Sequence, residues 1–147
     1  ADMIGLLQRV SHAEVSVDGE TIGSIGRGLM VLVAVHRDDT DKEVARLAER
    51  LLGYRVFPDD AGRMNRSVSD VGGGLLLVPQ FTLTADTKKG TRASFTRGAA
   101  PDRASQLFDR LVEICRGGLE CVETGRFGAH MQVSLTNDGP VTFWLET

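Results

Sequence analysis

Two short polar stretches interrupt otherwise apolar strands, and they are the first candidates for chemistry. Gln80 and Thr82 lie in "VPQFTL", and "NDGPVT" begins at Asn137. Pro79 has no N–H for a β-ladder and marks a strand end or edge, so we expect Gln80 and Thr82 to point to one face and Phe81 to the other. Amide and hydroxyl groups at such places either satisfy local backbone groups or bind a ligand. Two such stretches in one chain favour a binding site.

The familiar active-site signatures are not found in the sequence. His12, His36 and His130 are far apart, without HExxH or cysteines at ligand spacing, so we expect no metal site. The glycines at 72–74 precede a strand and no G-K-[ST] follows, which argues against a nucleotide-binding loop. There is no G-x-S-x-G elbow, although sequence order leaves a Ser-His-Asp triad open. Cys115 falls on the apolar face of a predicted helix, which favours a buried thiol over a nucleophile.

A polar loop directly follows the first stretch. It spans Ala85–Ala100, lacks clear periodicity and carries the basic side chains Lys88, Lys89, Arg92 and Arg97. Such side chains either form a solvated loop or contact phosphate groups. The net charge of −3 argues against non-specific coating of nucleic acid but allows a local basic patch.

A mixed set of strands and helices must position these candidates. Strands are predicted over Met3–Val10, Ala13–Val17, Thr21–Ile25, Gly28–Val35, "YRVF", "ECVETG", "MQVSL" and "VTFWL". Gly72–Leu83 is predicted to be a buried strand that runs into a loop. Amphipathic helices are predicted from Thr40 or Asp41 to Gly53, and from Pro101-Asp102 to Gly117-Gly118. Strands and helices in blocks predict an α+β fold, with a mixed, curved and barrel-like sheet that carries the two main helices on one side.

Length and composition set the remaining limits. The chain has 147 residues, 41% apolar and 25% charged, which predicts a single globular domain over 1–147 that needs no disulfide or metal. No apolar run approaches the ~20 residues of a membrane span. The first residues do not form a secretory signal, so we expect a cytoplasmic protein. Met3 is expected to be the natural start, with Ala1-Asp2 an added remnant.

Four segments carry a family resemblance: "MIGLLQRV", "GRMNRSV", "PQFTLTADTKKGTRASF" and "TGRFGAHMQVSLTNDGPVTFWL". With the spacings between them, they resemble D-aminoacyl-tRNA deacylase, or D-tyrosyl-tRNA(Tyr) deacylase, over essentially the whole chain. The family signature Asn-x-Gly-Pro-x-Thr is fully matched at 137–142. The signature Ser-Gln-x-Thr-Leu is matched from Gln80 onward, with Pro79 where the family has serine.

This resemblance implies a hydrolase that cleaves the ester bond of D-aminoacyl-tRNA, and of glycyl-tRNA, as chirality proofreading in translation. It implies a homodimer with active sites at the subunit interface, no cofactor, and no membrane or DNA partner. Gly139 and Pro140, joined by a cis peptide bond in the family, would enter the partner's pocket and exclude L-amino acids with main-chain oxygens.

The resemblance also implies roles for single residues. The backbone donors of Gln80, Phe81 and Thr82 would bind the ester carbonyl. Phe81 would line the adenine pocket, and Thr82 would orient water or the ribose hydroxyl. Arg9 would brace the Gly-Pro segment. The supporting residues are Pro79, Asn137 and Thr142, and the tRNA-binding residues are Lys88, Lys89, Arg92 and Arg97.

Three alternatives stay open. Pro79 resembles an animal-specific branch in which the Gly-Pro bond is trans and small L-amino acids such as alanine are removed from mischarged tRNA. A non-catalytic tRNA-binding module on the same fold would bind tRNA and release no amino acid. A small-molecule hydrolase would be insensitive to removal of the tRNA body.

Overall fold

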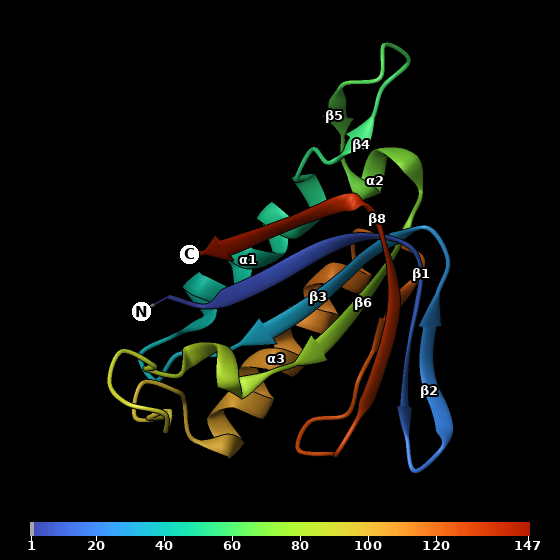
Figure 1. The fold of residues 1–147 in the computed structure, drawn as a ribbon. Coiled ribbons are helices and arrows are strands. Elements are labelled where there is room, and N and C mark those ends of the chain that lie inside the picture. The colour runs from blue at the N-terminus through green and yellow to red at the C-terminus, as the bar shows by residue number, and fades with distance from the viewer. Residues whose placement is uncertain (1) are drawn as a thin grey trace.

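Strand β1 (Ile4–Val17) runs through the centre of the sheet in a computed structural model that describes residues 2–147. Along one side, β1 pairs antiparallel with β8 (Gln132–Glu146). Along its other side it pairs with β3 (Gly28–Ala34) through its first half and with β2 (Glu20–Ile25) through its second half. The register between β1 and β8 shifts around Val10, and the sheet bends strongly in this region (Figure 1).

Two parallel pairings complete the sheet. β6 (Gly74–Pro79) lies parallel to β3, and β7 (Val122–Thr124) lies parallel to β6. β3 and β6 are apolar and almost wholly buried, as expected for parallel strands with both faces covered. The two strands come very close at their first residues, where a Cβ on Gly28 would lie 1.9 Å from the Gly74 carbonyl oxygen. Any side chain at position 28 would push these strands apart.

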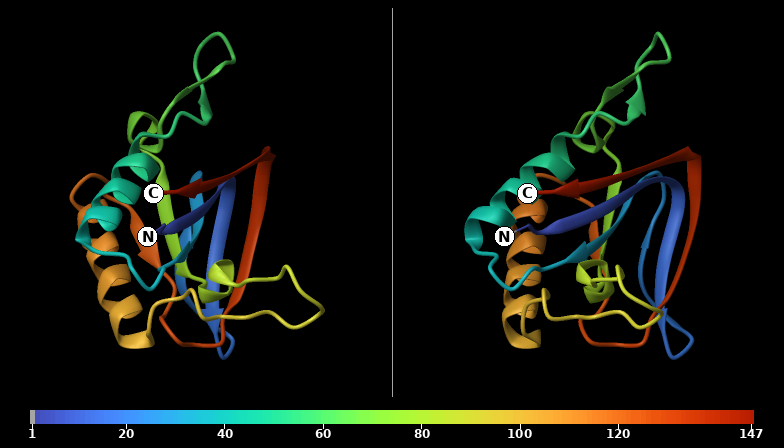
Figure 2. Two further views of the ribbon diagram at one scale, coloured as in Figure 1. Left: turned by 90° about the vertical axis from the view of Figure 1, so that its left-hand side faces the viewer. Right: turned by 60° about the vertical axis from the view of Figure 1, so that its left-hand side comes forward.

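Two helices, α1 (Asp41–Gly53) and α3 (Pro101–Arg116), cover one face of the sheet (Figure 2). A capping box starts α1, in which Thr40 N–H donates to the Glu43 carboxylate over 2.7 Å and the Thr40 side chain accepts from the helix. Proline at the first position of α3 has no N–H to leave unpaired. The main core lies between helices and sheet and includes Leu7, Leu29, Val31, Leu47, Leu51, Leu75, Leu77, Phe108 and Leu111.

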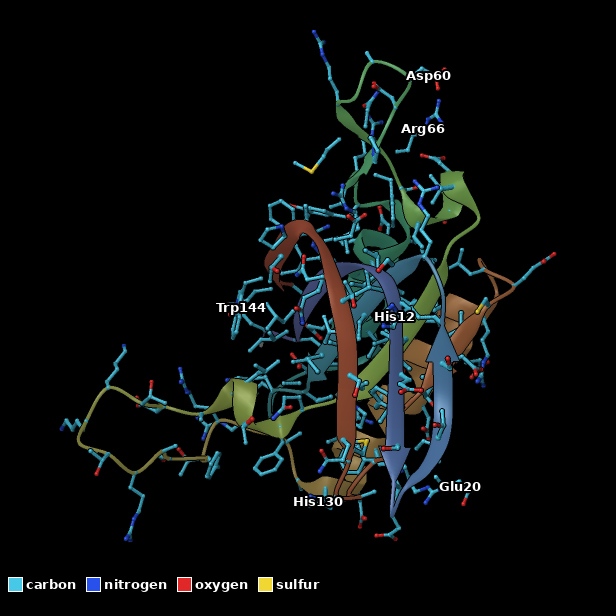
Figure 3. The ribbon with its side chains drawn as sticks, turned by 45° about the vertical axis from the view of Figure 1, so that its right-hand side comes forward. His12, Glu20, Asp60, Arg66, His130 and Trp144 are labelled. Carbon is cyan, nitrogen blue, oxygen red and sulfur yellow. The ribbon has the colours of Figure 1, made fainter. Side chains whose placement is uncertain are left out.

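The opposite face of the sheet is not covered by α1 or α3. A smaller buried cluster here includes Val10, Val15, Met30, Leu76 and Val78. Beside it, Leu6 of β1 is half-buried and pairs with Leu32 of β3 and with Trp144 of β8. Trp144 is 48% exposed and stands out from β8 in Figure 3. This face therefore presents apolar side chains to its surroundings.

The architecture confirms the predicted α+β class, but two predicted breaks between strands are wrong. The strands predicted at Met3–Val10 and Ala13–Val17 are one strand, because a register shift bends β1 without ending its pairing. The segments "MQVSL" and "VTFWL" likewise belong to one strand, β8, which continues through the Gly-Pro pair.

Three further elements differ from prediction. The buried strand predicted within Gly72–Leu83 is confirmed as β6, but it runs into a 3-10 helix, η1 (Phe81–Thr84), and not into a loop. Gln80, Phe81 and Thr82 therefore do not alternate across a strand. The strand predicted in "YRVF" is limited to β4 (Phe57–Pro58), which forms a projecting hairpin with β5 (Met64–Arg66). A short helix, α2 (Val68–Val71), follows the hairpin.

Among the described residues, no helix is both long and apolar enough to span a membrane.

Candidate active site

An apolar cavity of about 400 Å³ lies where β3 and β6 end. Gln80 and Phe81 form part of its wall at the start of η1, and Phe108 of α3 and Phe127 form other parts. Cavities of this size and apolar character commonly bind one small-molecule ligand or cofactor-sized group. The first polar stretch identified in the sequence therefore borders a binding cavity.

The start of η1 supplies the polar edge of this cavity. The Gln80 N–H donates to the Val33 carbonyl over 2.7 Å. This corrects the expectation that the N–H groups of Gln80, Phe81 and Thr82 all face the substrate, because that of Gln80 is already bound within the sheet. The first N–H groups of a helix have no partner inside it, and the Gln80 side chain does not cap them. The candidate donors are thus those of Phe81 and Thr82, while the Gln80 amide binds the Thr82 hydroxyl.

Two aromatic rings stand at the mouth of the cavity. Phe81 is 64% exposed and Phe95 is 46% exposed, and their ring centroids are 5.2 Å apart. The buried Thr84 hydroxyl donates to the Phe81 carbonyl over 2.8 Å and fixes the turn that carries this ring. Phe95 was not singled out from the sequence, although a lone aromatic residue within a polar loop was the available signal.

The basic loop extends from the same region, away from the two long helices (Figure 2). Its base is closed by two backbone hydrogen bonds between Asp86 and Ser94, of 2.8 and 2.9 Å. Lys88, Lys89 and Arg92 lie beyond this closure and are exposed. Arg97 instead donates to the Ala85 carbonyl over 2.8 Å and holds the loop together.

The second polar stretch forms an exposed bend within β8. The Gly139–Pro140 peptide bond is cis, which is the geometry implied by the family resemblance, and both residues are exposed. The Asn137 side-chain oxygen accepts from the Val141 N–H over 2.7 Å, and its amide nitrogen donates to the Thr142 hydroxyl over 2.8 Å. Asparagine and threonine of the signature therefore clamp the two ends of the bend.

Arg9 fixes the position of this bend through hydrogen bonds. Its Nε donates to the Asp138 carbonyl over 2.9 Å, and its Nη1 donates to the Val56 carbonyl over 2.6 Å. The Arg9 side chain is only 14% exposed. The guanidinium thus ties the Gly-Pro segment to the base of the β4–β5 hairpin. Gln8 contributes as well, because its side-chain oxygen accepts from Asn137 over 3.3 Å. Gln8 and Val56 were not identified from the sequence.

The cavity and the Gly-Pro bend lie far apart in one protomer. Gln80 binds Val33, which pairs with Gly5 of β1, which in turn pairs with Leu145 of β8. Gly139 lies six residues before Leu145 in β8, and six residues of strand span about 20 Å. Figures 1 and 2 both show the bend of β8 and the loop after η1 at opposite ends of the sheet. One protomer therefore does not bring the two signatures together.

Other potentially reactive groups serve the fold. Burial raises the pKa of the Cys115 thiol to about 12, so it is protonated near neutral pH and is a poor nucleophile. Burial also raises the pKa of Asp39, whose carboxylate accepts the His36 N–H over 2.6 Å and holds the loop after β3. His12 and His130 are well separated in Figure 3. Within residues 2–147, no three His, Cys, Asp or Glu side chains gather closely enough to hold a metal ion.

The chain is similar to known proteins over almost its whole length. The family model described as D-Tyr-tRNA(Tyr) deacylase matches residues 6–146. The D-aminoacyl-tRNA deacylase of Alkalilimnicola ehrlichii is 64% identical, with 98% of this chain and 96% of that protein aligned. The protein of the same name from Thioalkalivibrio sulfidiphilus is 65% identical over 98% of this chain and 97% of its own.

Two solved structures share the fold. A c-Myc DNA Unwinding Element Binding Protein superposes with a TM-score of 0.93 and 38% identity, covering 98% of both chains. A protein described as a "probable eukaryotic D-amino acid tRNA deacylase" superposes with a TM-score of 0.89 over all of both chains. At 20% identity, the second likeness concerns the fold alone.

Proposed function

The chain belongs to the D-Tyr-tRNA(Tyr) deacylase family and is an aminoacyl-tRNA deacylase, and we propose that it proofreads chirality with a site shared between two copies of the chain. In this proposal the cavity of one protomer binds the aminoacyl ester of tRNA. The Gly139–Pro140 segment of its partner reaches into that cavity and excludes L-amino acids. We expect the enzyme to act in the cytoplasm.

The separation of the two signatures is the observation that carries this proposal. The Gly-Pro bend is exposed, is clamped by Asn137 and Arg9, and lies far from the cavity of its own protomer. Well-ordered main chain that projects into solvent is available to a neighbouring molecule. A two-fold symmetric dimer would supply each cavity with one bend from the other chain.

The uncovered face of the sheet supports a partner of the same kind. Trp144, Leu6 and Leu32 form an apolar row across β8, β1 and β3, and Met131 and Leu135 lie half-buried near the same face. Contiguous exposed apolar surface of this sort marks interaction sites in soluble proteins. A second copy would cover the row with its own matching row, as an isologous interface requires.

Hydrolysis of the aminoacyl ester would require few side-chain functional groups. An aminoacyl ester is already activated, because its ammonium group and the adjacent ribose hydroxyl favour expulsion of the leaving group. Two N–H groups, from Phe81 and Thr82, would stabilise the oxyanion that forms when water or the ribose hydroxyl attacks the carbonyl. Positioning of the ester then contributes the rest of the rate enhancement.

Chirality would be judged by main-chain atoms. When the ammonium group and the carbonyl carbon of the substrate are held, the side chain and the hydrogen on Cα exchange places between D and L forms. Main-chain oxygens of Gly139 and Pro140 would then clash with an L side chain and leave a D side chain free. Glycine has no side chain to exclude, so glycyl-tRNA would also be hydrolysed.

Binding of the tRNA body would involve the basic loop. Lys88, Lys89 and Arg92 are exposed beyond the closure between Asp86 and Ser94, where acceptor-stem phosphates could reach them. Contacts of this kind weaken as salt concentration rises. Arg97 would act indirectly, because it braces the loop through Ala85.

Hydrolysis of matched D-tyrosyl-, L-tyrosyl- and glycyl-tRNA by the purified protein tests the proposal. We expect rapid release of D-tyrosine and glycine and retention of L-tyrosine. Equal rates on the D and L esters would overturn the chirality filter, and binding of tRNA without release of amino acid would overturn catalysis. L-Alanyl-tRNA(Thr) belongs in the same series, because Pro79 borders the cavity where the family signature has serine.

A further inference from the structure

Phe95 forms an aromatic platform together with Phe81. The two rings are tilted by 57° and contact each other, but each keeps a large part of its surface in solvent. Both rings line the cavity, and Phe95 comes from the segment that follows the closed base of the basic loop. Exposed aromatic rings next to basic side chains are typical of surfaces on which nucleic-acid bases stack.

The segment that carries Phe95 is fixed by hydrogen bonds on both sides. Before it, Ser94 exchanges two backbone hydrogen bonds with Asp86. After it, the Gly98 N–H donates to the Phe95 carbonyl over 3.3 Å, and the Ala99 N–H donates to the Val35 carbonyl over 3.0 Å. The exposed ring therefore has a defined position before any ligand binds, which lowers the entropy cost of binding.

We infer that Phe95 binds the base of the nucleotide that precedes the terminal adenosine of tRNA, a cytidine. This inference rests on the proposed function. A cavity of about 400 Å³ is the size for one aminoacylated nucleoside. The rest of the nucleotide chain must therefore leave the cavity across its mouth. Phe95 is the next aromatic ring there after Phe81.

The charge around Phe95 fits the same path. Lys88, Lys89 and Arg92 are exposed on the loop whose base adjoins Phe95, so a phosphate that follows the stacked base would meet positive charge. Stacking on an aromatic face tolerates any base, and the contact would therefore serve every tRNA. In this arrangement Phe95 contributes to binding of the nucleotide chain and not to the chemistry at the ester.

The test compares three substrates that share the D-tyrosyl ester: D-tyrosyl-adenosine, the D-tyrosyl trinucleotide CCA, and the same trinucleotide with an abasic penultimate nucleotide. We expect Phe95→Leu to lower kcat/KM on the complete trinucleotide by about 5- to 150-fold, the range for loss of one base–aromatic stack. The same variant should lower kcat/KM on D-tyrosyl-adenosine by a clearly smaller factor, because that substrate has no penultimate base to stack on the ring. Phe95→Tyr keeps the ring and should behave as the wild type on all three substrates.

The abasic substrate closes a thermodynamic cycle. Removal of the base should lower kcat/KM of the wild type by the same factor as Phe95→Leu does. It should not lower kcat/KM of the variant any further. A loss of equal size on D-tyrosyl-adenosine would overturn the inference, because Phe95 would then only support Phe81. The inference would also be overturned if removal of the base and removal of the ring lowered kcat/KM independently, so that the two factors multiplied. Failure of the proposed function itself would look different, since the wild type would then release D-tyrosine from none of the substrates.

Discussion

Arg9 donates a hydrogen bond from Nε to the main-chain carbonyl of Asp138 over 2.9 Å, directly before Gly139. The same guanidinium binds the Val56 carbonyl, and a lysine ammonium cannot reproduce this fork. We expect Arg9→Lys to lower the D-over-L selectivity of deacylation by about 10- to 100-fold, because the bend loses its position. Stability should fall by only about 1–3 kcal/mol, the cost of an unpaired carbonyl.

Steady-state kinetics and denaturant unfolding measure these two effects separately. Arg50→Lys is the matched control, since Arg50 also binds a main-chain carbonyl, that of Glu146, but lies on α1. The control should keep the wild-type D-over-L selectivity. Unchanged selectivity in Arg9→Lys would show that the bend needs no brace.

Gly139 occupies backbone space that an L side chain rarely adopts. Its φ is +145°, and an added Cβ would lie 2.6 Å from Val141 Cγ2 and 2.9 Å from Val141 N. Gly139→Ala should therefore reshape the bend, reduce D-over-L selectivity by about 10-fold or more, and cost about 1–3 kcal/mol of stability. Gly26→Ala is the control, because its Cβ would meet nothing within 4 Å. Selectivity that is the same in both variants would contradict this assignment.

Mixing two damaged chains tests whether the site is shared. Phe81→Ala damages the cavity and should abolish deacylation, whereas Pro140→Ala damages the bend and should let L-tyrosyl-tRNA be hydrolysed. After random subunit exchange, half of the dimers are mixed, and in each of these the intact cavity faces an intact bend, so mixing should halve the release of L-tyrosine. Release of L-tyrosine that does not change on mixing would mean that both parts act within one protomer.

The start of α1 should make stability depend on pH. Hydrogen bonds from the Thr40 side chain and backbone lower the pKa of Glu43. The ionised carboxylate therefore stabilises the fold above the ordinary glutamate pKa, and this contribution is lost as the pH falls through the lower folded value. Thr40→Ala should cost about 1 kcal/mol at pH 7, and Glu43→Gln somewhat less.

Thermal unfolding between pH 7 and pH 3 measures this dependence. The stability difference between wild type and Glu43→Gln should shrink as the pH falls. Glu49→Gln, which also replaces an exposed glutamate of α1 but lies outside the capping box, should show no such trend. A stability difference between wild type and Glu43→Gln that stays the same at all pH values would refute this role of Glu43 in the capping box.

The two cysteines should react very differently. Cys115 is buried and Cys121 is exposed. Burial raises the pKa of the Cys115 thiol to about 12, so at pH 8 the thiol is almost wholly protonated. Iodoacetamide should therefore label one thiol in the native protein and two after unfolding, as counted by mass spectrometry. Native Cys121→Ser should take up no label, and rapid labelling of that variant would show that the core opens readily.

Local patterns predicted the parts of the fold that local forces determine. The apolar run of β3 and the spaced apolar residues of α1 and α3 identify buried faces directly, and the structure confirms them. The continuity of β8 could not be predicted in this way. It follows from pairing with β1 on both sides of the bend, which joins opposite ends of the sequence. Turn-forming residues between two apolar segments normally indicate a loop.

The candidate site was predictable to a similar extent. The family resemblance identified both signatures, and their residues lie at the cavity and at the bend. The loss of Gln80 as a donor was not predictable, because its N–H partner Val33 belongs to another strand. Phe95 carries no motif, and its importance follows only from its contact with Phe81.

The bend in β8 consists of a glycine and a proline, neither of which has a functional group to modify. Oxidants, alkylating agents and phosphorylation have nothing to attack there. A single substitution within the bend alters its shape and does not adjust it gradually. Under the proposed filter, substrate choice would be altered mainly through the residues that hold the bend, Arg9, Gln8 and Asn137, and related enzymes with new preferences would be sought among natural variants at those positions.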